Sequence, residues 1–315
     1  MYDVHTHFIP TEVMDWLDEN KRRVNAEKEK RDADKSVFLN INGKWAFELK
    51  ELFIDEQLYI EKQKESGVVQ SLVSPIPQLF LYEFEKETTL ELSKVYNDSL
   101  CRMSKSFPSI AGLAALPLNA PGLAADELSR AMSNGLKGAI IGPGCGNLLL
   151  TDAAFTPLWE EANRLGAVIF IHPLLSEDPR LRQRMMPNLI GVPWETTLCA
   201  TDILLSGMMD KYPRVKILLA HGGGLLPYQV GRLDKGYSQW KQVKSALQAP
   251  PSEYLKRFWY DSVLWNSEAL QYLLKLVGEE KVLPGSDFPF DLCAWPPLLA
   301  ENEAAYLSFV GDSRS

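Results

Sequence analysis

The chain has 315 residues, of which 46% are hydrophobic and 23% are charged, a composition typical of a globular protein. A net charge of -8 argues against nucleic acid and anionic membranes as partners, because both require a basic surface. No signal segment or membrane-spanning apolar run is evident, and the four cysteines lack metal-binding or disulfide spacing. We therefore expect a cytoplasmic protein with reduced thiols.

The first predicted element is a short strand that ends at His7. Side chains alternate along a strand, so His5 and His7 share one face. Residues 11–53 then form an insertion, in which the charged segment from Glu12 to Lys35 is expected to be helical. Residues 37–49 predict a hairpin around Asn42-Gly43, a strong turn signal. We interpret this hairpin as a lid or pocket wall, with a purely structural role as the alternative.

From residue 54 the chain alternates predicted helices and strands. Helices are expected at 55–64, 83–106, 121–134, 155–165, 194–210, 227–245 and 268–277, and the strands that follow them at 68–73, 110–116, 138–142, 167–171, 215–221, 258–263 and 281–287. With the first strand, this order is that of a (β/α)8 TIM barrel. One domain spanning residues 1–315 is expected, with a final helix at 297–309.

The candidate site residues stand where predicted parallel strands end. Apolar runs lead into all four histidines, His5, His7, His172 and His221, and Asp287 follows the last strand. A parallel barrel builds its active site from this edge. Imidazole and carboxylate ligands suit Zn²⁺, and Mn²⁺, Fe²⁺ and Co²⁺ accept the same types. His221 either completes the ligand set or serves as a general acid/base.

These motifs resemble those of the amidohydrolase superfamily and, within it, the aminocarboxymuconate semialdehyde decarboxylase family. The resemblance extends from residue 1 to about residue 290 and rests on Asp3-x-His5-x-His7, His172-Pro173, Ala220-His221-Gly222-Gly223-Gly224, Gly285-Ser286-Asp287-Phe288-Pro289, the segment 189–197 and Val230-Gly231-Arg232. It implies one divalent ion, usually Zn²⁺, held by His5, His7, His172 and Asp287, with His221 as the acid/base. It also implies nonoxidative decarboxylation of a small unsaturated or aromatic carboxylic acid, commonly in a homodimer.

The sequence departs from the family pattern at the expected substrate contacts. The resemblance implies two arginines that bind the substrate carboxylate, one of them from the neighbouring subunit. Arg232 matches the arginine that comes from the neighbouring subunit. At the position of the other arginine this sequence has Phe47, which cannot form a bidentate contact with a carboxylate. Lys44 lies nearby and could supply a point charge. A flatter, more apolar pocket is therefore expected, with these aromatic residues as candidates and core packing as their alternative role: Trp45, Phe47, Trp194 and Phe288.

Two other functions fit the same residues. In hydrolysis of an amide, lactone or related bond, hydroxide attacks a carbonyl, Asp287 takes its proton and His221 stabilises charge. The second alternative is a non-catalytic barrel that binds a metal or another ligand, but this function would not explain why His221 lies at the same edge as the other site residues. No lysine stands where a carbamate bridge between two ions would need it, so a single ion is expected.

Overall fold

The computed structural model describes residues 1–31, 36–43, 46–299 and 302–311. Parallel strands form its centre, in two sheets with the orders β1-β5-β6 and β7-β8-β11-β12-β13-β14. These strands are β1 (Tyr2–His7), β5 (Gln70–Ser74), β6 (Ile110–Gly112), β7 (Ala114–Ala115), β8 (Gly138–Ile141), β11 (Val168–Ile171), β12 (Lys216–Leu219), β13 (Trp259–Asp261) and β14 (Val282–Leu283). Strands, and the helices between them, occur in the predicted order, so the α/β fold class is confirmed.

Backbone contacts join the two sheets at both ends. Only Leu113 separates β6 from β7, and its N–H donates to the carbonyl of Val73 at 2.9 Å. On the other side, the N–H of Val4 donates to the carbonyl of Pro284 at 2.9 Å, and the N–H of Asp287 donates to that of His5 at 2.7 Å. The carboxyl ends of β1, β11, β12 and β14 consequently face a common region.

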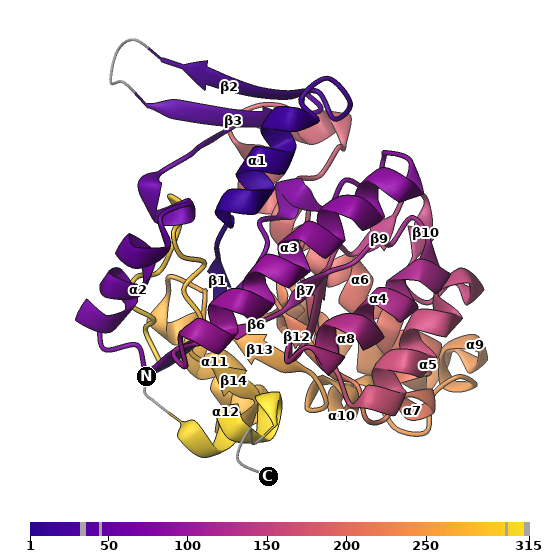
Figure 1. The fold of residues 1–315 in the computed structure, drawn as a ribbon. Coiled ribbons are helices and arrows are strands. Elements are labelled where there is room, and N and C mark those ends of the chain that lie inside the picture. The colour runs from indigo at the N-terminus through magenta and orange to yellow at the C-terminus, as the bar shows by residue number, and fades with distance from the viewer. Residues whose placement is uncertain (32–35, 44–45, 300–301, 312–315) are drawn as a thin grey trace.

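Helices surround these strands (Figure 1). They are α1 (Thr11–Glu19), α2 (Glu56–Glu65), α3 (Lys86–Ser106), α4 (Pro121–Ser133), α5 (Thr156–Leu165), α6 (Val192–Ser206), α7 (Met208–Lys211), α8 (Leu226–Gln239), α9 (Lys241–Lys244), α10 (Pro251–Leu255), α11 (Ser267–Val277) and α12 (Glu303–Val310). The predicted helix 194–210 breaks at Gly207, whose φ is +75° and where a Cβ atom would lie 2.2 Å from the carbonyl oxygen of Ala246. In the described residues, no helix is both long and apolar enough to cross a membrane.

The insertion corrects one prediction. The helix expected from Glu12 to Lys35 ends at Glu19, and β2 (Ala26–Lys30) pairs antiparallel with β3 (Val37–Ile41). The charged side chains of β2 are solvent-exposed, as they would also be on the outer face of a helix. The segment is a strand because it pairs with β3, and this pairing cannot be read from the local sequence. The guanidinium of Arg31 also lies 3.6 Å from the ring centre of Phe38.

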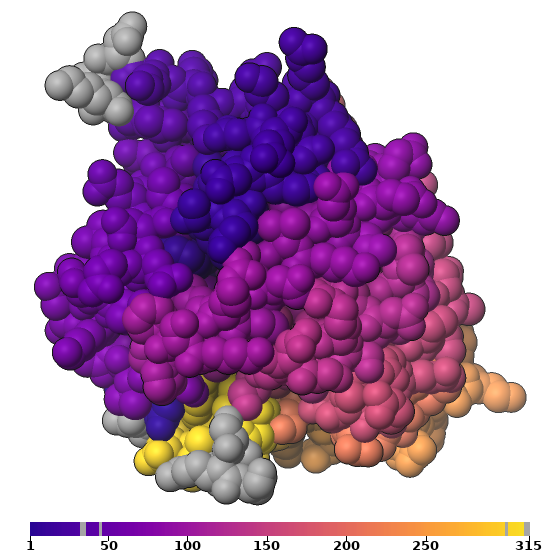
Figure 2. Space-filling view, in the orientation of Figure 1, coloured from indigo at the N-terminus to yellow at the C-terminus, as the bar shows by residue number. Residues whose placement is uncertain are grey.

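A third strand, β4 (Phe47–Glu48), pairs antiparallel with β3. After β3, Asn42 and Gly43 have left-handed φ values of +56° and +67°, as a tight hairpin turn requires. Leu39 lies opposite Phe47, and both are buried. Lys44 and Trp45, two of the pocket candidates, lie outside the described residues. Figure 2 shows the N-terminal insertion along the upper part of the molecule and the C-terminal segment at its base.

The apolar residues of the strands separate into two clusters. Val168 and Phe170 join one cluster, whereas the alternate residues Ile169 and Ile171 join the other, as a period of two requires. The smaller cluster collects residues from both sheets and includes Phe309 of α12. The ring of Phe309 lies 5.0 Å from that of Trp259, the first residue of β13, so α12 packs near the amino ends of the strands.

Candidate metal centre and its surroundings

Four predicted ligands converge at the carboxyl ends of β1, β11 and β14. Each of them, His5, His7, His172 and Asp287, can offer one ligand atom, and these atoms all lie within 4.8 Å of one another. All four residues are buried. Within β1 the register shifts between Asp3 and Thr6, an irregularity next to His5 that the sequence does not reveal.

Hydrogen bonds orient the three imidazoles. In each ring, Nδ1 faces an oxygen that can accept a hydrogen bond but cannot donate one. Nδ1 therefore carries the proton, and the lone pair of Nε2 is free to bind a metal. The Nδ1 atoms contact Oδ2 of Asp261 at 2.6 Å from His5, the carbonyl of Pro75 at 3.0 Å from His7, and the carbonyl of Pro173 at 2.9 Å from His172. The three rings therefore present the same atom to the site.

The donor atoms fit a divalent ion. Nε2 of His5 and Nε2 of His7 each lie 3.2 Å from Oδ1 of Asp287. Yet these three atoms and Nε2 of His172 are buried and have no hydrogen-bond partner among the described residues, whereas buried polar atoms normally have one. Three imidazole nitrogens and one carboxylate oxygen form a ligand set that suits zinc and also manganese.

Burial and charge act together on the titrations of these groups. Burial alone would raise the pKa of Asp287, but electrostatic attraction to His5 and close contacts with His221 and His7 hold it well below its usual range. Burial, followed by the charges of His5 and His7, lowers the pKa of His172 well below its usual range. Burial likewise lowers the pKa of His7. Neutral imidazole is the form that binds a metal, so both shifts favour metal binding.

His221 lies beside this cluster, directly after β12. Its Nε2 is 3.5 Å from Oδ2 of Asp287, and its buried Nδ1 has no hydrogen-bond partner in the described residues. The ring stacks on Trp265, with centroids 6.2 Å apart and planes inclined by 17°. His221 can thus reach both the carboxylate and a molecule bound next to the cluster.

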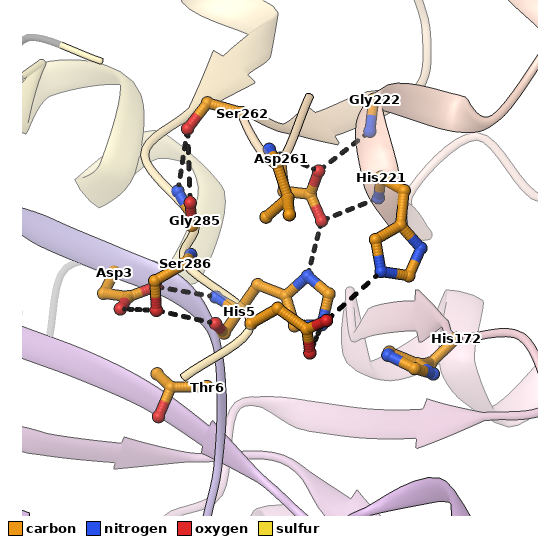
Figure 3. A network of polar contacts seen from close by, with 12 residues as sticks. Asp3, His5, Thr6, His172, His221, Gly222, Asp261, Ser262, Gly285 and Ser286 are labelled. Carbon is orange, nitrogen blue, oxygen red and sulfur yellow. Dashed lines mark hydrogen bonds and ion pairs between the residues drawn. The ribbon is translucent and has the colours of Figure 1, made fainter. Parts of the chain in front are cut away.

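Asp261, at the end of β13, connects His221 to His5 (Figure 3). Its Oδ2 accepts from the His5 ring at 2.6 Å and from the backbone N–H of His221 at 2.9 Å, and its Oδ1 accepts from the N–H of Gly222 at 2.8 Å. His221 has a φ of +54°, unusual for a residue with a side chain. The carboxylate holds this turn in place. Sequence reasoning missed its role, although a carboxylate at a strand end was a signal.

Asp3 makes a second polar connection, between β1 and the segment that carries Asp287. Its buried carboxylate accepts from the hydroxyl of Ser286 at 2.5 Å, and from the backbone N–H groups of Ser286 and His5 at 3.1 Å each. Burial raises the pKa of Asp3 to about 7, although these hydrogen bonds oppose the shift. Figure 3 shows Asp3 and Ser286 beside His5, and the network holds the segment so that Oδ1 of Asp287 lies 3.2 Å from Nε2 of His5.

The predicted substrate contacts occupy different environments. Phe47 is buried, with its ring 5.9 Å from that of Phe290, which in turn lies 5.2 Å from His7. Phe288 packs in the core against Tyr59 and Trp295. Trp194 on α6 and Arg232 on α8 are exposed. Phe290 and Trp265 are further neighbours of the site that the sequence pattern does not predict, because their positions depend on loop geometry.

Fold and site together define a parallel α/β protein with a candidate metal centre at the carboxyl ends of its strands. The amidohydrolase family model matches residues 2–310, and the chain belongs to that family. It is 32% identical to a 2-amino-3-carboxymuconate-6-semialdehyde decarboxylase of Dictyostelium discoideum, over 80% of this chain and 71% of the relative.

Solved structures of decarboxylases share the fold. A 5-carboxyvanillate decarboxylase from Sphingomonas paucimobilis superposes with a TM-score of 0.80 at 24% identity, covering 99% of this chain and 96% of the other. A dihydroxybenzoic acid decarboxylase from Polaromonas sp. JS666, with bound manganese and the inhibitor 2-nitroresorcinol, gives a TM-score of 0.75 at 22% identity, with 99% and 91% coverage. These similarities support the α/β architecture.

Proposed function

We propose that this protein is a metal-dependent decarboxylase that releases CO₂ from a small unsaturated or aromatic carboxylic acid without oxidation. The observation that carries the proposal is a set of four buried ligand atoms next to His221 that have no hydrogen-bond partner in the described part of the chain. Membership of the amidohydrolase family and the decarboxylase names of its relatives support this reaction. Manganese in structural neighbours supports a divalent ion, and Zn²⁺ stays our expectation from the ligand types.

His5, His7, His172 and Asp287 would hold the ion. A bound divalent ion would supply Lewis acidity, which would polarise a substrate oxygen. His221, on the other side of Asp287, supplies a proton to the carbon that bears the carboxylate. The carbon–carbon bond then breaks, its electron pair stays with the protonated carbon skeleton, and CO₂ leaves. Asp287 holds His221 in place through its Oδ2 contact of 3.5 Å.

The proposed enzyme is a single-domain barrel that acts as a homodimer. The sheet contacts support a closed eight-stranded barrel in one domain, and we keep the prediction of a cytoplasmic enzyme. A homodimer is supported by exposed apolar side chains on α6 and α8, among them Trp194 and Tyr228. Arg232 follows Tyr228 by one helical turn, so both share a face of α8. In such a dimer Arg232 would reach a partner's site and contact the substrate carboxylate.

Elemental analysis and a CO₂-release assay on the same sample test the proposal. One divalent ion per chain, with CO₂ released from a panel of hydroxylated aromatic and muconate-like acids, is the expected result. One ion with hydrolysis of esters or lactones and no CO₂ from any acid would instead favour a hydrolase. A chain that turns over its acid substrate equally well after complete metal removal would contradict the metal-dependent reaction.

A further inference from the structure

Cationic side chains precede several neighbouring strands at the end of the sheet opposite to the histidines. Lys137 directly precedes β8, and Lys216 opens β12 two residues after Arg214. Arg257 lies two residues before β13, and Lys281 directly precedes β14. The sheet order β8-β11-β12-β13-β14 brings these amino ends together. One end of the sheet is therefore rich in positive charge.

These five residues, together with Lys256, line a cavity of about 870 Å³. Ser308 and Val310 of α12, with Gly311 directly after it, form another part of its wall. Figure 1 shows α12 at the base of the molecule. No acidic residue lines the cavity in the described part of the chain, although the protein carries a net charge of -8. Its volume lies within the range of roughly 300–1,000 Å³ that is common for small-molecule sites.

Ion pairs within the protein neutralise Arg257 and Lys256. Arg257 pairs with Asp210 at 2.5 Å, and Lys256 pairs with Glu253 at 3.0 Å. Lys216, Lys281 and Arg214 have no ion pair with any carboxylate among the described residues. Within the part of the chain that the structure describes, Lys216, Lys281 and Arg214 therefore give the cavity wall an excess of positive charge.

Among the described residues, Lys216 and Lys281 each contact neutral groups. Nζ of Lys216 donates to the carbonyls of Ser308 and Phe309, each at 2.9 Å. Nζ of Lys281 lies 4.3 Å from the ring centre of Trp259. Both ammonium groups are thus held at the wall by carbonyl dipoles and an aromatic face, which position a charge without cancelling it.

Burial makes these positive charges costly. It lowers the pKa of Lys216, and the nearby charge of Lys137 lowers it further. Burial also lowers the pKa of Lys281, with Glu280 acting in the opposite direction. A bound anion would favour the charged forms of both lysines. Half-buried cations of like sign around one cavity are therefore complementary to a ligand that carries several negative charges.

We propose that this cavity binds a small polyvalent anion bearing phosphate groups or several carboxylates. The site is separate from the proposed metal centre, since its residues open the strands whose opposite ends carry the histidines. A ligand that binds only the folded protein also stabilises it. Anion binding should therefore raise the melting temperature and weaken as ionic strength rises.

Calorimetric titration of the metal-loaded protein with pyrophosphate tests this site. The wild-type chain is expected to bind one pyrophosphate, and Lys281→Gln combined with Lys216→Gln should weaken binding by about tenfold or more, equal to about 1.4 kcal/mol. Lys94→Gln, the same change on an exposed lysine of α3 outside the cavity, should leave affinity within about twofold. Citrate in a parallel titration distinguishes a carboxylate ligand from a phosphate ligand.

Two controls keep the result interpretable. If the double variant melts early because the α12 contacts of Lys216 are lost, Lys281→Gln combined with Arg214→Gln replaces it. Absence of pyrophosphate binding by the wild-type chain would overturn the proposal. Binding that survives both double variants unchanged but disappears on metal removal would also overturn it, because the anion would then occupy the metal centre.

Discussion

One carboxylate oxygen of Asp261 accepts hydrogen bonds from both the ring of His5, at 2.6 Å, and the backbone of His221, at 2.9 Å. A proposed metal ligand and the proposed acid therefore depend on the same buried atom. The carboxylate orients the Nε2 lone pair of His5 toward the cluster and holds the left-handed turn at His221. Asp261 is a positioning residue whose loss should affect metal affinity and turnover together.

Asp261→Asn should weaken metal binding by about 10–100-fold, because an amide is a poorer acceptor for the His5 ring than a carboxylate. Competition with a chelator of known affinity measures this change. Asp202→Asn, which alters a carboxylate bonded to Thr151 at 2.6 Å, serves as a control and should keep wild-type metal affinity. Equal metal affinities for Asp261→Asn and wild type would contradict the orienting role.

Single substitutions should distinguish the two proposed roles of the histidines, which are metal ligation and proton donation. His172→Ala removes one of the four ligand atoms and should abolish stoichiometric metal binding, together with turnover. His221→Ala should retain the ion while turnover falls by about 10²–10⁴-fold, as expected for loss of a general acid. Elemental analysis of each purified variant distinguishes these cases. Loss of the ion from His221→Ala would instead identify His221 as part of the ligand set.

The turn after His221 should not tolerate side chains. At Gly224, where φ is +64°, a Cβ atom would lie 2.3 Å from the carbonyl oxygen of Pro193 and 2.8 Å from Oγ1 of Thr197. Gly224→Ala should therefore lower the free energy of unfolding by about 1–3 kcal/mol. Gly231→Ala on α8 meets nothing within 4 Å and should raise stability by up to about 1 kcal/mol. Thermal and urea unfolding compare the pair, and equal stabilities would contradict the steric argument.

Trp265 offers a flat surface beside the site. Its indole stacks on His221, its Nε1 donates to the carbonyl of Leu292 at 2.7 Å, and about half of its side chain is exposed. Trp265→Leu should raise KM for an aromatic acid by about two- to tenfold, since a stacked aromatic pair is worth about 0.5–1.5 kcal/mol, while metal content stays unchanged. The equally exposed Trp240 supplies the control variant Trp240→Leu. An unchanged KM would exclude Trp265 from the substrate contacts.

The sequence by itself predicted the α/β alternation and the meeting of five site residues. This was possible because each strand is a local apolar run, and parallel strands bring their carboxyl ends to one side. The same local reasoning was wrong for the charged segment before residue 31. Residues Ala26–Lys30 form a strand only because Val37–Ile41 lies beside them, and charge pattern does not encode that pairing.

Only the tertiary structure decided how the site is supported and what surrounds it. Asp261 lies 256 residues from His5, and Asp3 lies 283 residues from Ser286, yet each pair is joined by a buried hydrogen bond. The ring of Phe290 against His7 and the indole of Trp265 against His221 are set by loops whose conformation depends on long-range contacts. The periodic pattern of apolar and polar residues predicts which side chains of one strand or helix lie on the same face. Contacts between distant segments arise when the strands pack, because the distance and direction between two side chains are properties of the folded backbone.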